Sequence, residues 1–214
     1  MINDLDGDLI NFWRIVRDHH EELIQSFDYT LCSREVFNEY RARFETSTYD
    51  NDIQRAHIFY YLNKSTFGGR MNTTLAFGVN KGKDRQHLRM ENVESIIRQC
   101  YERIKNVVIE HLSYQDILQR YDHATSFFFL DPPYRTGKQY RPGSFSDEDY
   151  QFFADQCRNL KGKFLLTIND DPFIRDLFKE FNFIEREVNY TLNISVQKKS
   201  KELIITNYDC VQGA

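Results

Sequence analysis

Hydrophobic residues in the first half of the chain recur every three or four positions, which is the spacing of one helix face. A first amphipathic helix is predicted over residues 6–24 by five residues in phase: Leu9, Phe12, Trp13, Val16 and Leu23. The same spacing predicts helices over residues 33–44, 51–62 and 91–104. Residues 63–90 contain four glycines and show no helical period, which predicts loops and a short hairpin.

The second half of the chain alternates short apolar strands with helices. A capping-box pattern at Ser146 to Asp149 opens one helix, and Asp171-Pro172 opens another that ends near Lys179. Strands are predicted at residues 107–109, 126–130, 164–168, 183–195 and 201–208. Apolar strands that alternate with helices indicate an α/β fold with a mostly parallel sheet that is buried on both faces. The last two strands suggest one antiparallel edge.

Charge is distributed unevenly along the chain. The 214 residues carry a formal charge of −4 and a pI near 5.9, which argues weakly against a dedicated nucleic-acid binder. Residues 61–90, however, hold six basic residues and one acidic residue. A local positive segment of this kind is suited to a polyanionic partner.

Neither a metal site nor a membrane segment is expected. The four cysteines, Cys32, Cys100, Cys157 and Cys210, are far apart, and the six histidines show no HxxxH spacing. No apolar run reaches the roughly 18 residues of a membrane span, and the acidic N-terminus does not resemble a signal peptide. A reduced cytoplasmic protein without metal is the simplest interpretation.

The segment Asp131-Pro132-Pro133-Tyr134 follows the apolar strand at residues 126–130. In an open α/β sheet, ligands bind beyond the carboxyl ends of the strands. The two prolines fix the backbone and direct their carbonyl acceptors. A carboxylate, rigid carbonyl acceptors and an aromatic face suit a flat heteroaromatic ring with an exocyclic NH₂ group. If both amino hydrogens are accepted, the nitrogen lone pair stays available for attack. The alternative is an ordinary tight turn.

This tetrapeptide resembles the DPPY motif of amino-directed methyltransferases that use S-adenosylmethionine. The opening segment from Ile2 to Ile10 makes the chain similar to the Dam-type DNA adenine-N6 methyltransferases in particular. The resemblance implies a Rossmann-like methyltransferase sheet and methyl transfer to the exocyclic N6 of adenine in double-stranded DNA. It also implies that the target adenine is flipped out of the duplex. The catalytic residues implied are Asp131, Pro132, Pro133 and Tyr134.

The same resemblance assigns contacts with S-adenosylmethionine. Asp4 is implied to bind the ribose, and Asp131 lies at the cofactor. Tyr114 and Asp116, in the segment that follows the strand at residues 107–109, are implied to lie beside the cofactor adenine. The alternative for Asp4 is a helix N-cap, and the alternative for Tyr114 and Asp116 is an ordinary helix start.

Residues 55–83 resemble the helical and hairpin region with which the family grips DNA. Phosphate contacts are expected from Lys64, Arg70, Lys81 and Lys83, with base reading by Arg70 and Asn72. A solvated basic loop is the alternative. Residues 33–104 would form this helical target-recognition insertion, and residues 1–32 and 105–214 would form a partial catalytic domain.

The family normally begins with a first strand that ends in an FxGxG-type loop, and no such loop stands at the start of this sequence. The sheet is therefore expected to be incomplete at its N-terminus, and the chain to be a truncated or split enzyme that binds S-adenosylmethionine poorly alone. An exposed sheet edge would favour self-association or a complementing N-terminal segment. A bacterial or phage source is expected, with a link to restriction-modification.

Other functions remain open from the sequence. Within enzymes, RNA or protein-glutamine amino-methyltransferases use similar sites, although the basic insertion before the DPPY strand favours DNA. In another class, the chain would be a catalytically inactive DNA-binding or partner subunit.

Overall fold

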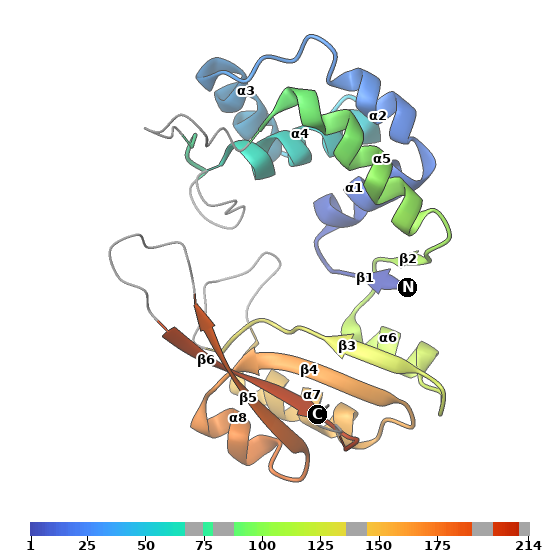
Figure 1. Cartoon of the computed structure of the whole chain (residues 1–214), viewed down its shortest axis with the longest axis vertical. Coiled ribbons are helices and arrows are strands. Elements are labelled where there is room, and N and C mark those ends of the chain that lie inside the picture. Colours follow the sequence, from blue (N-terminus) through green and yellow to red (C-terminus); the bar gives the residue numbers. More distant parts are fainter. Residues whose placement is uncertain (67–74, 79–87, 136–144, 190–198, 210–214) are drawn as a thin grey trace. The chain divides into compact units, whose positions relative to one another are not determined.

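The computed structural model describes residues 1–66, 75–78, 88–135, 145–189 and 199–209. The chain forms two compact units, Met1–Leu112 (unit 1) and Ser113–Ala214 (unit 2), which are considered separately below (Figure 1). This division follows compactness alone. The functional domain boundaries predicted from the sequence remain a prediction.

Unit 1 is mostly helical, and its central helix is α4. Consecutive residues of α4, from Ala56 to Leu62, are all buried, so this helix is surrounded on every side by its neighbours α1, α2 and α3. Phe12 of α1 and Phe37 of α3 belong to the resulting core. The helices of the unit are α1 (Gly7–Asp18), α2 (His20–Ser26), α3 (Arg34–Glu45), α4 (Asp52–Ser65) and α5 (Val93–Ile104), which follows a 3₁₀ turn, η2 (Met90–Asn92).

The prediction of one continuous helix over residues 6–24 is wrong. Asp6 caps α1 by accepting hydrogen bonds from the two backbone N–H groups of Asp8 and Leu9, at 2.9 and 3.2 Å. The helix ends at Asp18 because His19 adopts φ −141° and ψ 33°, and α2 starts at the next residue. The polar residues at this break do not interrupt the hydrophobic spacing, so periodicity could not locate it. The helices that follow confirm the predicted ones within a few residues.

A short parallel sheet completes unit 1. Strand β1 (Ile2–Asn3) pairs with β2 (Ile109–Glu110), and the Asn3 side chain exchanges two hydrogen bonds with the Leu112 backbone at 2.9 and 3.0 Å. The prediction of a buried strand at residues 107–109 is wrong in its bounds and in the burial of Val108. The strand begins only at Ile109, and Val108 is 53% exposed.

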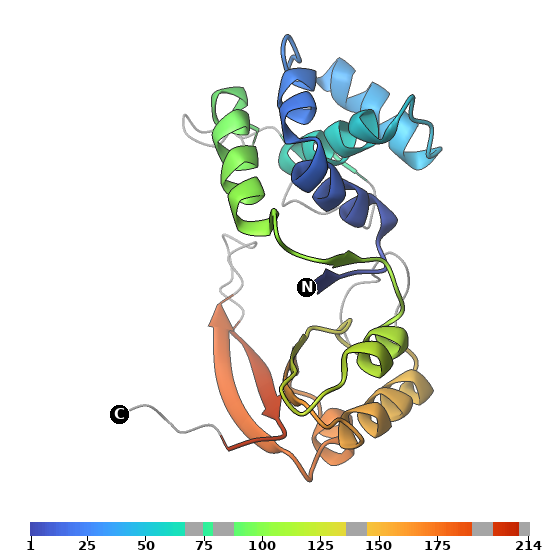
Figure 2. The ribbon, with the colours of Figure 1, turned by 90° about the vertical axis from the view of Figure 1, so that its right-hand side faces the viewer.

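Unit 2 is a four-stranded sheet in the order β3-β4-β6-β5. Strands β3 and β4 are parallel, whereas β6 is antiparallel to both β4 and β5, which confirms the antiparallel pair predicted at the C-terminus. Figures 1 and 2 show the helices of this unit together on one face of the sheet. The elements are α6 (Tyr114–Tyr121), β3 (Phe127–Leu130), α7 (Asp147–Arg158), β4 (Lys163–Asn169), α8 (Pro172–Leu177), β5 (Asn182–Asn189) and β6 (Lys199–Thr206).

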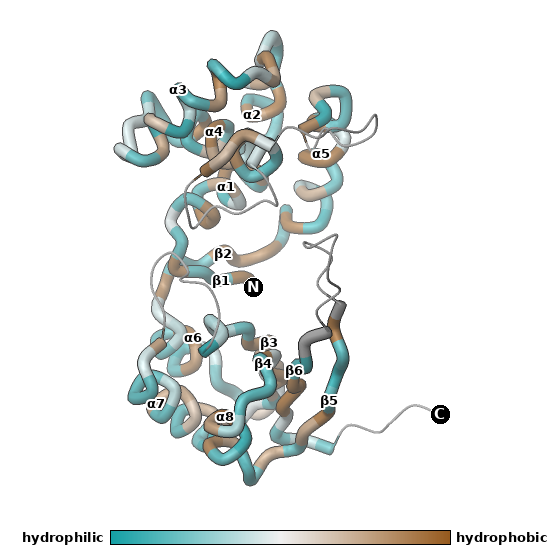
Figure 3. The backbone as a smooth tube through the Cα atoms, turned by 90° about the vertical axis from the view of Figure 1, so that its left-hand side faces the viewer, coloured by the Kyte–Doolittle hydropathy of each residue, from teal (hydrophilic) through white to brown (hydrophobic). Residues whose placement is uncertain are grey.

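The two faces of this sheet differ in burial. On the helix-covered face, apolar side chains of β3, β4 and β6 are buried, and Figure 3 shows hydrophobic residues concentrated in these strands. On the opposite face, Phe127 and Phe129 of β3 are 56% and 65% exposed. The prediction of burial on both faces is therefore wrong for β3, because no described helix of unit 2 packs over them.

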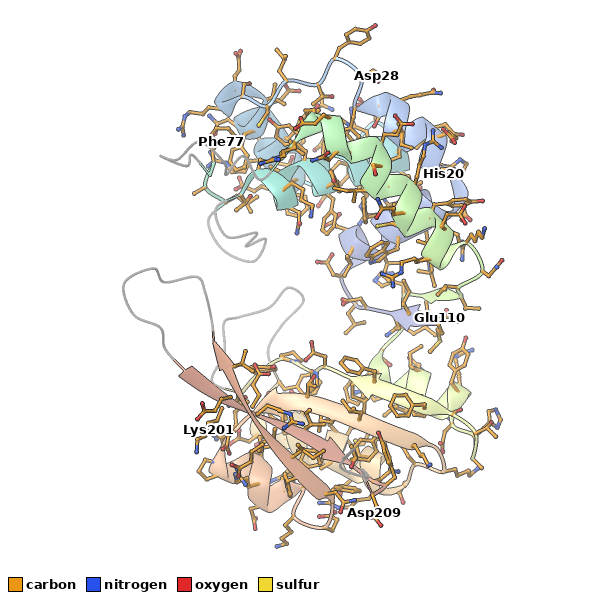
Figure 4. The ribbon with its side chains drawn as sticks, in the orientation of Figure 1. His20, Asp28, Phe77, Glu110, Lys201 and Asp209 are labelled. Atoms are coloured by element: carbon orange, nitrogen blue, oxygen red, sulfur yellow. The ribbon has the colours of Figure 1, made fainter. Side chains whose placement is uncertain are left out.

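The region predicted as loops and a hairpin, residues 63–90, is described in part. Helix α4 extends to Ser65, and Thr66 then forms an antiparallel bridge with Phe77. The Phe77 ring, labelled in Figure 4, packs 5.3 Å from that of Phe37. Among the described residues, no helix is both long and apolar enough to cross a bilayer.

Candidate functional site

The carboxyl end of β3 places Asp131 beside the neighbouring strand. Leu130 pairs with Leu166 in the parallel register, so Asp131 and Thr167 are adjacent across β3 and β4. The Thr167 hydroxyl donates to Asp131 Oδ1 at 2.9 Å. The carboxylate is otherwise exposed, and its Oδ2 accepts no hydrogen bond from the described residues. One oxygen of Asp131 is therefore held by the protein while the other stays available.

The two prolines that follow differ in their carbonyl groups. The buried Tyr150 of α7 donates its hydroxyl hydrogen to the Pro133 carbonyl. The Pro132 carbonyl has no donor among the described residues. The sequence suggested both carbonyls as acceptors, and the structure leaves only the Pro132 carbonyl available within the part of the chain it describes.

Arg135 fixes the end of this loop. Its guanidinium donates two hydrogen bonds to Asp147 at 2.8 and 3.0 Å, lies 3.4 Å from an oxygen of Asp171, and sits 4.6 Å from the centre of the Phe173 ring. Asp147 starts α7 and Asp171 caps α8, so one side chain joins the loop to two helix N-termini. The hydrogen bonds from Arg135 lower the pKa of the Asp147 carboxyl. Tyr134, which lies between Pro133 and Arg135 in the sequence, is half-buried.

The two remaining residues predicted in unit 2 lie at the start of α6. Ser113 caps the helix and also donates its hydroxyl hydrogen to Asp116 Oδ2 at 2.6 Å. The Tyr114 ring packs against Phe145 and Phe153, with ring centres 5.5 and 5.2 Å away. Burial raises the pKa of Tyr114 to about 12. These contacts are those of an ordinary helix start, and they leave the exposed Asp116 Oδ1 accessible.

Asp4 follows β1 in unit 1. Its Oδ1 accepts a hydrogen bond from the Asp6 backbone N–H at 2.7 Å, whereas Asp6 itself caps α1. The helix N-cap interpretation of Asp4 is therefore wrong. Asp4 Oδ2 has no donor among the described residues, so this carboxylate can still accept hydrogen bonds from hydroxyl groups. Glu110, labelled in Figure 4, marks the end of the paired strand β2.

Of the residues predicted to contact DNA, the structure describes Lys64. It lies in the last turn of α4, half-buried, with Nζ 5.7 Å from the centre of the Tyr60 ring. Arg70, Asn72, Lys81 and Lys83 lie outside the described residues. Within the described ranges, no cluster of three or more metal-ligating side chains occurs.

Sequence reasoning missed three residues that hold the loop in place: Thr167 on β4, Tyr150 on α7, and Arg135 at the end of the loop. Thr167 is the single polar residue in the apolar run from Phe164 to Ile168, and a hydroxyl in that position was a detectable signal. Tyr150 was recognised as part of the apolar face of α7, but its hydroxyl contact depends on tertiary packing. Arg135 directly follows the tetrapeptide and gave no signal of its partners.

The sequence of the chain is similar to those of several known proteins. The profile of the D12 class N6 adenine-specific DNA methyltransferase family matches residues 1–192. A Type II methyltransferase, M.CviBI of Paramecium bursaria Chlorella virus NC1A, is 26% identical over 97% of this chain and 81% of its own length. The Type II methyltransferase M1.LlaDCHI of Lactococcus lactis subsp. cremoris is 29% identical over 97% of this chain and 79% of its own length. The DNA adenine methylase of Escherichia coli K12 is 25% identical over 95% of this chain and 77% of its own length.

Proposed function

The chain belongs to the D12 class of N6 adenine-specific DNA methyltransferases, and from this premise we propose that Asp131 and Pro132 bind the exocyclic amine of the adenine that is methylated. The enzyme methylates adenine in DNA. Asp131 Oδ2 and the Pro132 carbonyl would each accept one N6 hydrogen. Acceptance of both hydrogens directs the nitrogen lone pair away from the protein and toward the methyl donor.

The observation that supports this proposal is which acceptor oxygens of residues 131–133 already have a hydrogen-bond donor. Thr167 donates to one carboxylate oxygen and Tyr150 donates to the second proline carbonyl, so Asp131 Oδ2 and the Pro132 carbonyl are two acceptors of this segment without a donor among the described residues. An amine with two hydrogens is the donor that matches such a pair.

DNA binding follows from the same reaction. An adenine within a duplex has its amino group in a base pair, so it must be flipped out before Asp131 can reach it. In this proposal Tyr134 stacks on the flipped base. Lys64, Arg70, Lys81 and Lys83 contact phosphates, and Arg70 and Asn72 also read bases.

We propose S-adenosylmethionine as the methyl donor, which when bound supplies an electrophilic methyl group on a sulfonium. Asp4 fits its ribose because one carboxylate oxygen remains available for hydroxyl donors. Tyr114 and Asp116 fit the adenine edge of the cofactor as an aromatic face and an accessible acceptor. In this proposal Asp131 contacts both the cofactor and the target base, and so positions them relative to each other.

Two further properties belong to the proposal. The names of two relatives, Type II methyltransferases, favour a role in restriction-modification. The exposed aromatic side chains on β3, an edge strand of its sheet, favour self-association or pairing with a complementing N-terminal segment.

The experiment that tests the proposal uses tritiated S-adenosylmethionine with double-stranded DNA, followed by nucleoside analysis. At saturating S-adenosylmethionine, which compensates for the weak cofactor binding expected of this chain, we expect label in N6-methyladenine from the unmodified chain and none from Asp131→Ala, with DNA affinity largely retained in the variant. A chain that binds DNA but transfers no label would support the inactive subunit instead. Preferential labelling of RNA would support the RNA methyltransferase.

A further inference from the structure

Two hydroxyl groups outside the tetrapeptide hold the acceptors on either side of Pro132. Thr167 lies on β4 and contacts the Asp131 carboxylate, whereas Tyr150 lies on α7 and contacts the Pro133 carbonyl. The two contacts come from different elements of unit 2, and each reaches a different end of the same three-residue segment.

The Thr167 contact is specific in direction. Its hydroxyl has one hydrogen and two nearby acceptors: Asp131 Oδ1 at 2.9 Å and the Leu130 carbonyl at 3.5 Å. The shorter distance lies in the usual range for a hydrogen bond between oxygens, and a donor facing a charged carboxylate forms the stronger bond. Asp131 therefore receives the hydrogen.

This bond limits the rotation of the carboxylate. The terminal torsion of an aspartate side chain is broad, so an exposed carboxylate turns freely unless a partner fixes it. With Oδ1 held on the β4 side, Oδ2 is fixed in direction. The strands supply the rigidity, because the β3–β4 register places Thr167 directly across from Asp131.

The Tyr150 contact acts on the backbone. Tyr150 is fully buried, and its ring packs among Phe145 and Phe173, so its hydroxyl has a fixed position. By donating to the Pro133 carbonyl it sets the orientation of the Pro133–Tyr134 peptide, and so anchors the segment directly after the Pro132 carbonyl. It also takes one of the two acceptor positions of the Pro133 oxygen, which makes that oxygen a poorer acceptor for an incoming amine.

We propose that Thr167 and Tyr150 are positioning residues that select Asp131 Oδ2 and the Pro132 carbonyl as the acceptor pair for the adenine amine. Neither residue touches the reacting atoms in this account. The inference rests on the proposed function of Asp131. Its consequence is that loss of either hydroxyl slows methyl transfer without weakening substrate binding.

The test measures single-turnover methyl transfer together with the dissociation constants for DNA and for S-adenosylmethionine. Thr167→Val keeps the shape of the side chain and removes the donor, and we expect a rate about tenfold to a hundredfold lower with both dissociation constants unchanged. Thr167→Ser restores the hydroxyl and should recover most of the rate. Tyr150→Phe should lower the rate in the same way.

A matched control is Thr206→Val, which removes a hydroxyl from β6 of the same sheet. That hydroxyl donates to the Tyr208 carbonyl at 2.8 Å, away from the loop, so the rate should not change. Thermal unfolding of every variant identifies any that fail to fold. If Thr167→Val fails to fold, the methyl-transfer rates of Thr167→Ser and Thr167→Ala are compared instead.

Asp131→Ala distinguishes the proposed function from the positioning role, because it removes both carboxylate oxygens, whereas an asparagine would keep one acceptor oxygen. If Asp131→Ala transfers methyl groups at the normal rate, the proposed function of Asp131 is wrong. If Asp131→Ala is inactive while Thr167→Val and Tyr150→Phe keep the full rate, the positioning role is wrong and the function stands. An equal loss of rate in Thr167→Val and Thr206→Val would also overturn the positioning role.

Discussion

At the scale of single residues, the environment of a side chain decides which of its atoms can react. Asp131 is exposed, and Thr167 donates to its Oδ1 while its Oδ2 has no donor among the described residues. The same rule applies to the carbonyl groups of Pro132 and Pro133. The free acceptors proposed for the loop are therefore expected to depend on two hydroxyl groups that lie outside the motif, those of Thr167 and Tyr150.

His57 in α4 shows how the environment also changes the properties of a side chain in the hydrophobic core of unit 1. Its ring stacks on Phe27 at 4.0 Å between centres, and Nδ1 lies 2.9 Å from the Ser26 hydroxyl oxygen. Ser26 donates its own hydrogen to the Leu23 carbonyl at 2.6 Å, which favours the His57 tautomer with its hydrogen on Nδ1 as the donor to Ser26. His57 Nε2 is buried with no partner among the described residues. Burial lowers the pKa of His57 from 6.5 to about 4.

This pKa predicts that the chain loses stability as pH falls. Between pH 6.5 and about pH 4 the unfolded state binds a proton at His57 that the folded state does not, so stability decreases across that window. The total loss from this group is on the order of 3 kcal/mol. Urea unfolding followed by the fluorescence of Trp13, at pH 7.5 and at several lower values, measures it.

The comparison variant is His57→Asn, which keeps a donor for Ser26 and does not titrate. It should lose less stability between pH 6.5 and pH 4 than the unmodified chain, although it will be less stable at pH 7.5 because it fills less of the core. His123→Asn, at an exposed histidine, should behave like the unmodified chain. Equal pH slopes for His57→Asn and the unmodified chain would show that His57 does not titrate as proposed.

At the scale of elements, β3 has a different environment on each face. Phe128 is buried beneath the helices, while Phe127 and Phe129 are largely exposed on the other face of an edge strand. An exposed apolar edge is a surface on which another strand or another copy of the chain can pair. The proposed self-association is therefore expected to depend on these two side chains.

Sedimentation velocity of the unmodified chain and of the double variant Phe127→Glu/Phe129→Glu tests this expectation. The unmodified chain should sediment above the mass of one 25.7 kDa chain, and the double variant should return to that mass, because charge at the edge opposes pairing. Phe152→Glu changes a phenylalanine of α7 that is 48% exposed and serves as the control. A monomeric unmodified chain, or an equal effect of Phe152→Glu, would contradict the prediction.

Local sequence signals predicted helix starts well, because the hydrogen bonds that cap a helix join residues only a few positions apart. The capping box at Ser146 and the Asp171-Pro172 start are confirmed because each depends on contacts within one helical turn. The break at His19 was missed because it lies between two helices with continuous hydrophobic spacing. The exposure of Phe127 and Phe129 was missed because an apolar run does not reveal which faces are covered.

At the scale of the whole molecule, the family could be inferred from the sequence because its motif is contiguous. Asp131 to Tyr134 stand together in the chain, and the profile match to residues 1–192 confirms the resemblance. Two partners of this motif, Tyr150 and Thr167, are 17 and 36 positions away in sequence from the residues that they contact. Only the sheet register and the packing of α7 bring them to the loop, so a local pattern could mark Thr167 as unusual in its apolar strand but could not assign the partner of either residue.

The central claim is that Asp131 and the Pro132 carbonyl together accept the two N6 hydrogens of a flipped adenine. The most direct measurement is a crystal structure of the chain bound to a duplex that it methylates. The account predicts N6 within about 3 Å of both Asp131 Oδ2 and the Pro132 oxygen, with Thr167 still bonded to Oδ1. A target adenine whose N6 faces the Pro133 carbonyl, or lies out of reach of Asp131, would contradict it.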